Sequence, residues 1–114
     1  MFYTSHIQLS RSALAKNYRY IRELVGPDVK ISSVVKGNAY GHGIEPFVRM
    51  AQECGNSHFS VYSADEALRV RNTAFPGSEV LIMGWLDDAE VEWAVENDVQ
   101  FFVFKKHRLM AAIN

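Results

Sequence analysis

The most informative stretch of the chain is Val34-Val35-Lys36-Gly37-Asn38-Ala39-Tyr40-Gly41-His42-Gly43. An apolar run, Ile31 to Val35, leads into this stretch and is typical of a buried strand. Lys36 stands at the end of that run, and the three glycines that follow within seven residues form a loop that lets backbone come close to a ligand. Because a lysine at a strand end is poorly placed for a core, the stretch predicts a functional site.

Short apolar segments alternate with amphipathic ones along the rest of the chain. We expect strands at 4–9, 29–35, 58–62, 80–83 and 101–104, and helices from Ser10 or Ser12 to Val25, at 44–54, at 64–72, from Asp87 to the turn at 97–98, and at 105–114. Ser63 with Glu66, and Asp87 with Glu90, have capping-box spacing. Apolar strands joined by helices predict an α/β fold with a parallel sheet, either doubly wound or part of a (β/α)8 barrel.

The length of the chain bears on this choice. A complete (β/α)8 barrel needs about 250 residues, and 114 residues hold four βα units preceded by one short strand. The chain also ends in a helical pattern at residues 111–114, without a glycine or proline stop. We therefore expect one partial barrel domain over 1–114, with a leading strand at 1–9 and βα units over 10–114, as a fragment of something larger.

Composition excludes several classes of protein. A net charge of −1, from 12 basic and 13 acidic residues, disfavours nucleic-acid binding. No apolar run is long enough for a membrane helix, and residues 1–6 do not resemble a secretory signal. Cys54 is the single cysteine, so no internal disulfide forms, and we expect a cytoplasmic protein. His6, His58 and His107 lack metal-ligand spacing, so no metal site is expected.

The chemistry of the central stretch points to a carbonyl cofactor. Lysine forms a covalent link with an aldehyde and acts as a base once released. Tyr40 can aim a hydroxyl at an anionic group, and amides at the helix start after Gly43 can help to hold a phosphate. Pyridoxal phosphate requires such a combination. The glycine spacing differs from the dinucleotide and P-loop patterns, and for Lys36 alone a solvated strand-end lysine is the simpler interpretation.

The whole stretch resembles the pyridoxal-phosphate attachment signature of alanine racemases, usually written VVKANAYGHG, with Gly37 in place of the usual alanine. The flanking segments resemble the same family: His6-Ile7-Gln8-Leu9-Ser10, Ala64-Asp65-Glu66-Ala67-Leu68 and Val80-Leu81-Ile82-Met83-Gly84. The resemblance covers all 114 residues, as the N-terminal part of the family's barrel domain. The fold it implies is the N-terminal half of a (β/α)8 TIM barrel.

The resemblance also implies a function. Alanine racemases interconvert L- and D-alanine, supply D-alanine for peptidoglycan, and work as head-to-tail dimers of a barrel and a β-rich C-terminal domain, against which their first strand packs. Lys36 would hold pyridoxal 5′-phosphate and move the Cα proton on one face, Tyr40 would hydrogen-bond the phosphate, and Met83 would line the cofactor. The family's second base, a tyrosine of the C-terminal domain, lies beyond this chain. We therefore expect the isolated chain to be inactive and to self-associate.

Three alternatives stay open, one of which is a structural fragment without activity. A non-catalytic pyridoxal-phosphate-binding protein of cofactor homeostasis shares the barrel lysine, although residues 40–43 count against it. Serine and broad-specificity racemases share the signature, so the amino acid that is racemised is open. His42 is expected to stabilise the loop rather than to act as an acid or base.

Overall fold

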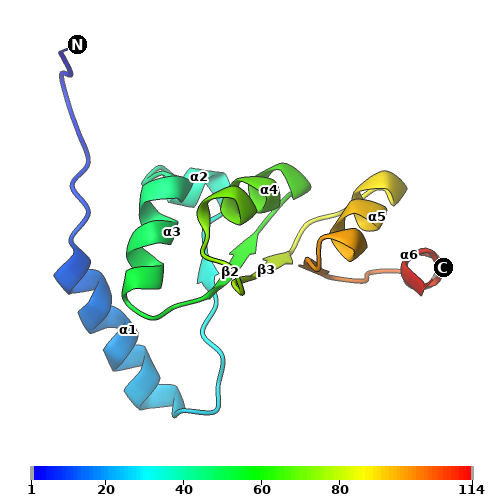
Figure 1. The fold of residues 1–114 in the computed structure, drawn as a ribbon, viewed down its shortest axis with the longest axis horizontal. Coiled ribbons are helices and arrows are strands. Elements are labelled where there is room, and N and C mark those ends of the chain that lie inside the picture. Colours follow the sequence, from blue (N-terminus) through cyan, green and yellow to red (C-terminus); the bar gives the residue numbers. More distant parts are fainter. Residues whose placement is uncertain (1, 114) are drawn as a thin grey trace.

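The computed structural model describes residues 2–113. Along the chain the elements are α1 (Arg11–Val25), β1 (Ser33–Val34), α2 (Lys36–Tyr40), α3 (Ile44–Glu53), β2 (His58–Val61), α4 (Ala64–Thr73), β3 (Glu79–Ile82), α5 (Asp88–Glu96), β4 (Gln100–Phe101) and α6 (Lys106–Ile113) (Figure 1). None of the helices within this range has the length and apolar character that crossing a bilayer requires.

The four strands form one parallel sheet in the order β1-β2-β3-β4, and α3, α4 and α5 lie in a row along one side of it (Figure 1). Phe59, Val61, Val80 and Ile82 point to that side and are completely buried. A doubly wound sheet would reverse its strand order and carry helices on both faces. Sequential order with helices on one face is the winding of a barrel, so the expected α/β half-barrel fold is confirmed.

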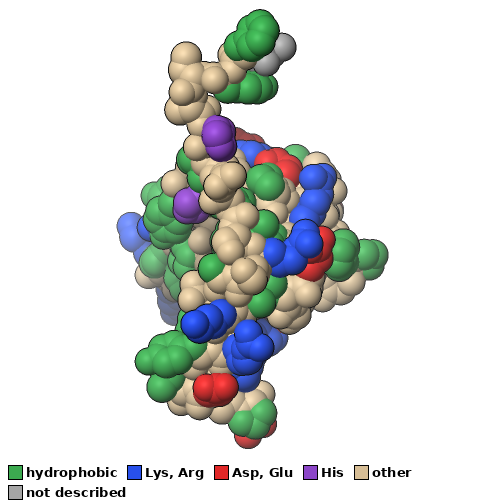
Figure 2. All heavy atoms as spheres, turned by 90° about the vertical axis from the view of Figure 1, so that its left-hand side faces the viewer, with side chains coloured by type: hydrophobic (Ala, Val, Ile, Leu, Met, Phe, Trp, Pro, Cys, Tyr) green, Lys and Arg blue, Asp and Glu red, His purple; other side chains and the backbone are tan. Residues whose placement is uncertain are grey.

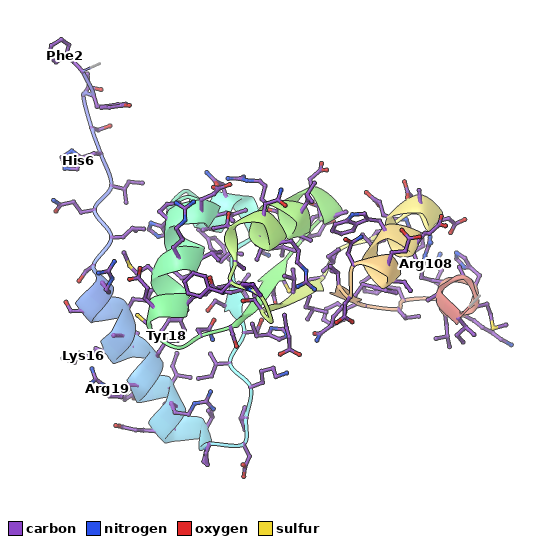
Figure 3. The ribbon with its side chains drawn as sticks, in the orientation of Figure 1. Phe2, His6, Lys16, Tyr18, Arg19 and Arg108 are labelled. Atoms are coloured by element: carbon purple, nitrogen blue, oxygen red, sulfur yellow. The ribbon has the colours of Figure 1, made fainter. Side chains whose placement is uncertain are left out.

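The capping residues set the helix starts as the sequence predicts. Ser10 accepts a hydrogen bond from the Ala13 amide at 3.2 Å, and both capping boxes form at Ser63–Glu66 and Asp87–Glu90. Helix α1 has no buried residue, and it is tied to β1 by the hydroxyl of Tyr18, which reaches from the helix to Ser33 (Figure 3). Burial of Tyr18 raises the pKa of its phenol.

The face of the sheet opposite the helices carries a chain of polar side chains toward its amino end. The two ring nitrogens of His58 lie 2.7 Å from Ser32 Oγ and 3.0 Å from Gln100 Oε1. Gln100 in turn donates to Glu79, which pairs with Lys30 at 2.6 Å. This polar chain links β2, β3 and β4, which carry His58, Glu79 and Gln100, to the segment before β1, which carries Ser32 and Lys30.

Two strands are shorter than predicted. Of residues 29–35 only Ser33–Val34 pairs with β2, opposite Phe59 and Ser60, and residues 30–32 run beside the sheet without strand pairing. Of residues 101–104 only Phe101 is in β4: the Phe102 amide makes the last contact, to Ile82 at 3.3 Å, beyond which β3 has ended. Phe102, Val103 and Phe104 are exposed. The last predicted helix spans Lys106–Ile113, and Asn114 lies outside the described residues.

The predicted strand at 4–9 is wrong. This segment is extended but pairs with no strand of the described chain, and it projects from the body of the molecule (Figure 2). Phe2 and His6 lie on this projection (Figure 3), and Phe2 and Ile7 are exposed. Alternation of apolar residues gives a segment one apolar face, but a strand also needs hydrogen bonds from a neighbouring strand, and no strand within residues 2–113 pairs with this segment.

Candidate functional site

The carboxyl ends of the parallel strands meet at one edge of the sheet, and Lys36 lies there, two residues beyond β1. An open cavity of about 630 Å³ at this edge is lined by Lys36, Gly37, Tyr40, Tyr62, Ser63 and Glu66. Its size falls within the about 300–1,000 Å³ typical of small-molecule sites. The two residues proposed from the sequence, Lys36 and Tyr40, therefore share one cavity, together with the residues that follow β2.

The segment after Lys36 winds in a left-handed turn. Gly37, Asn38, Ala39 and Tyr40 have φ values of +61°, +55°, +56° and +56°. Only glycine adopts this conformation freely, and other residues lose roughly 1–2 kcal/mol each in it. Such strain persists only where neighbouring groups determine the backbone. The glycine-rich loop that the sequence predicts is thus a fixed structure, which holds the side chain of Tyr40 64% exposed.

Asn38 is one of the groups that fix the turn. Its side-chain oxygen accepts hydrogen bonds from the Ile44 amide at 3.0 Å and from Arg69 at 2.8 Å. Arg69 also forms a two-pronged ion pair with Glu45, at 2.9 and 2.7 Å. The hydrogen bond from Arg69 holds the pKa of the Glu45 carboxyl below its ordinary value. Helix α4 therefore clamps both the turn and the start of α3.

Glu66 fixes the turn from a second side. One carboxylate oxygen accepts from the Gly37 amide at 2.7 Å, and the other accepts from the amides of Tyr62 at 2.9 Å and Ser63 at 3.2 Å. The loops after β1 and β2 are thereby joined through one side chain. The sequence shows Glu66 only as a capping-box residue, and nothing in its local pattern indicates the contact with Gly37.

The amine of Lys36 is available for chemistry. Its side chain is exposed, and it makes no ion pair or hydrogen bond within residues 2–113. A free primary amine beside a phenol in an open cavity fits a carbonyl cofactor that carries an anionic group. Lys36 and Tyr40 are the two residues that would hold such a group.

Two amides at the start of α3, where the sequence predicts help in holding a phosphate, are already bonded. The Ile44 amide donates to the Asn38 side chain at 3.0 Å, and the Phe47 amide donates to the Gly43 carbonyl at 3.2 Å. A phosphate contact from this helix start stays a prediction. The Gly37 amide is likewise taken by Glu66.

Two further residues singled out from the sequence lie apart from the cavity. Met83 follows β3 at the same edge of the sheet, is half-buried, and is not among the residues that line the cavity with Lys36. His42 lines a separate groove, against Leu9, Ala13 and Phe47. The residue is exposed, and its amide donates to the Ala39 carbonyl at 3.0 Å, so the backbone of His42 takes part in the hydrogen bonds of the loop.

Comparison with known proteins gives consistent matches. The family model described as alanine racemase, N-terminal domain, matches residues 9–114. An alanine racemase of Leptospira interrogans is 37% identical over 103 residues, which cover 89% of this chain and 26% of the relative. The alanine racemase of Bacillus anthracis, solved with bound L-Ala-P, is 37% identical with a TM-score of 0.78, over 90% of this chain and 26% of that one.

A histidine racemase from Leuconostoc mesenteroides also has this fold. Its structure matches with a TM-score of 0.81 and 26% identity, over 91% of this chain and 27% of that chain. The chain thus spans about a quarter of the length of the relatives that it matches. In these solved structures the matching region is the N-terminal half of the barrel.

Proposed function

This chain belongs to the alanine racemase N-terminal domain family, and on that premise we propose that it supplies the cofactor-holding side of a pyridoxal-phosphate-dependent amino-acid racemase acting on alanine. The observation that carries the proposal is the unpaired Lys36 amine, which shares an open cavity with Tyr40. The protein then serves D-alanine supply for peptidoglycan, in the cytoplasm.

The residues of this chain have distinct tasks in the proposed reaction. Pyridoxal 5′-phosphate, when bound, supplies an electron sink that acidifies the Cα proton of an amino acid. Lys36 would hold the cofactor through its Nζ, and its amine, once free, would accept the Cα proton or return it on its own face. The Tyr40 hydroxyl would donate to the phosphate. The left-handed turn between them keeps both side chains on one cavity.

Inversion of configuration needs a second acid–base group on the opposite face of the substrate. The groups that line the cavity come from two neighbouring parts of the chain, the segment that follows β1 and the segment that follows β2 up to the first turn of α4. We propose that the opposite base comes from outside this chain, that the isolated chain is inactive, and that the protein works as a dimer. The exposed side chains of residues 102–104 favour self-association.

The proposal also includes the choice of amino acid that is racemised. Alanine is favoured by the two alanine racemases that are 37% identical to this chain. The match to a protein named histidine racemase gives a specific reason to include histidine among the tested substrates. Comparing the rates for L-alanine, L-serine and L-histidine in the full-length protein decides among them.

Cofactor attachment at Lys36 is tested by loading the protein with pyridoxal 5′-phosphate, reducing the adduct with borohydride and finding the modified peptide by mass spectrometry. We expect modification of Lys36 in the wild type and none in Lys36→Ala. Lys16→Ala is the matched control, because Lys16 lies on α1, away from the cavity (Figure 3). Modification elsewhere, with Lys36 untouched, would overturn the proposal. Attachment without racemisation in the full-length protein would favour the cofactor-homeostasis alternative.

A further inference from the structure

We propose that Glu66 is a positioning residue for Lys36: its carboxylate ties the backbone directly after Lys36 to the end of β2 and so fixes where the amine lies. The inference rests on the proposed function of Lys36. Its basis is that one side chain accepts hydrogen bonds from the amides of Gly37, Tyr62 and Ser63.

The backbone pairing around Lys36 is weak without this tie. β1 pairs with β2 over only Ser33–Val34, and Lys36 lies two residues beyond the last paired residue. The remaining backbone bond from this region to β2 is the Val35 amide to the Ser60 carbonyl, at 2.8 Å. Glu66 supplies the next connection along the chain, at Gly37, where the ladder has already ended.

The contact with Gly37 is not a general consequence of the capping box. Glu90 occupies the same place in the second box and accepts from the Asp87 amide at 2.8 Å, but within residues 2–113 no hydrogen bond joins it to the loop after a neighbouring strand. The chain therefore contains two chemically equivalent capping glutamates, of which one also holds the Lys36 turn. This difference makes Glu90 an internal control.

The chemistry of the carboxylate is suited to this task. A carboxylate accepts hydrogen bonds at both oxygens, so it can serve donors from two loops at once. Glutamine has nearly the same shape but one acceptor, and its NH₂ group would face either Gly37 or the amides of Tyr62 and Ser63. Glu66→Gln therefore breaks one side of the bridge without emptying the space. Glu66→Asp keeps both acceptors but shortens the reach by one methylene.

The test compares Glu66→Gln, Glu66→Asp and Glu90→Gln with the wild type, all in the full-length protein. The first measurement is hydrogen–deuterium exchange of the peptide covering residues 36–43 without cofactor. The second is the rate of pyridoxal 5′-phosphate attachment at Lys36 as a function of pH, followed by reductive trapping. Circular dichroism verifies that each variant is folded.

We expect Glu66→Gln to speed exchange of residues 36–43 and to slow attachment about tenfold, the loss that follows from removing a hydrogen bond to a charged group. Glu66→Asp should show a smaller loss, and Glu90→Gln should leave both measurements at wild-type values. A changed pH profile for Glu66→Gln would distinguish positioning of the amine from a general loss of stability, which would leave the profile in place.

The inference is overturned if Glu66→Gln and Glu90→Gln behave alike in both measurements. A folded Glu66→Gln with wild-type exchange and attachment overturns it as well. If the wild type itself takes up no cofactor at Lys36, the proposed function fails, while the exchange data still decide whether Glu66 holds the turn. If Glu66→Gln does not fold, Glu66→Asp is used in its place. Exchange and attachment rates equal to those of the wild type in Glu66→Asp would then contradict the inference.

Discussion

The amide of Gly84 donates to the carbonyl oxygen of Tyr62 at 2.9 Å, and a Cβ on Gly84 would lie 2.4 Å from that same oxygen. The ends of β2 and β3 are therefore as close as backbone allows at this point. Since Tyr62 is a wall of the Lys36 cavity, the absence of a side chain at position 84 helps to set the shape of the site.

Gly84→Ala is expected to displace Tyr62, because the clash involves backbone and the Tyr62 ring rather than a flexible side-chain end. Overpacking of this kind costs about 1–3 kcal/mol of unfolding free energy. Denaturant unfolding and cofactor attachment at Lys36 measure the two effects. Gly55→Ala is the control: it meets nothing within 4 Å, bears only the strain of a φ of +91°, and should leave attachment unchanged.

Replacing residues of the left-handed turn should have graded effects. The new methyl group of Gly37→Ala meets nothing within 4 Å, so the variant loses only the roughly 1 kcal/mol of unfolding free energy that a left-handed backbone costs alanine. The lower conformational entropy of its unfolded chain offsets part of that loss. Asn38→Ala should cost more, about 1–3 kcal/mol, because the Ile44 amide and Arg69 both lose their acceptor. Unfolding free energies of the two variants give the comparison. Equal losses would mean that the side chain of Asn38 does not hold the turn.

The ion pair of Glu79 with Lys30 should contribute to the fall in melting temperature at acid pH. The hydrogen bond from Lys30 lowers the pKa of Glu79 below its ordinary 4.5. A lowered folded-state pKa stabilises the protein above the unfolded value, and this contribution is lost as the pH falls through the folded-state pKa. Glu79→Gln should therefore flatten the fall in melting temperature below about pH 5. Both partners are exposed, so added salt should reduce the difference.

A matched measurement on Glu96→Gln, which alters an acidic residue outside the polar chain of the sheet, separates the pair from a change in net charge. If the fall in melting temperature at acid pH becomes equally shallow in both variants, the effect is due to overall charge rather than to the pair with Lys30.

His58→Phe should destabilise the fold through the polar chain that links the strands. The substitution removes the hydrogen bonds of the ring nitrogens to Ser32 Oγ, at 2.7 Å, and to Gln100 Oε1, at 3.0 Å. Ser32 still bonds Ser60 and Gln100 is exposed, so the expected loss of unfolding free energy is about 0.5–1.5 kcal/mol for each hydrogen bond. Denaturant unfolding measures the loss, and His107→Phe, at an exposed position beside Trp85, should change it little. A loss of the same size at His107 would contradict the role of the chain.

Local signals predicted the helices better than the strands. Ser10, Ser63 and Asp87 cap helices where the sequence places them, since a cap involves residues only three apart. The lengths of β1 and β4 depend on where β2 and β3 end, which no local pattern encodes. The segment at 4–9 has the alternation of a strand but no neighbouring backbone, so it forms none.

The same distinction applies to the site. Lys36 and Tyr40 were identified from their motif, and they do share a cavity. The left-handed turn between them was missed, because no strong intrinsic preference for left-handed backbone angles is present in Asn38, Ala39 or Tyr40. It forms through Glu66 and Arg69, which are 29 and 31 residues away from their partners in the turn. Tyr62 was missed as a cavity wall for a similar reason, since its place depends on Gly84.

The hydrogen bonds of Asn38 also bear on the chemical ageing of the protein. Deamidation begins when the backbone nitrogen of the next residue attacks the asparagine side-chain carbonyl carbon and expels ammonia. The Ala39 nitrogen donates to Val35 at 2.9 Å, while the Asn38 side-chain oxygen is held by the Ile44 amide and Arg69. Neither reacting group is free to turn toward the other. The turn thus shields its own asparagine from spontaneous conversion to aspartate for as long as the chain stays folded.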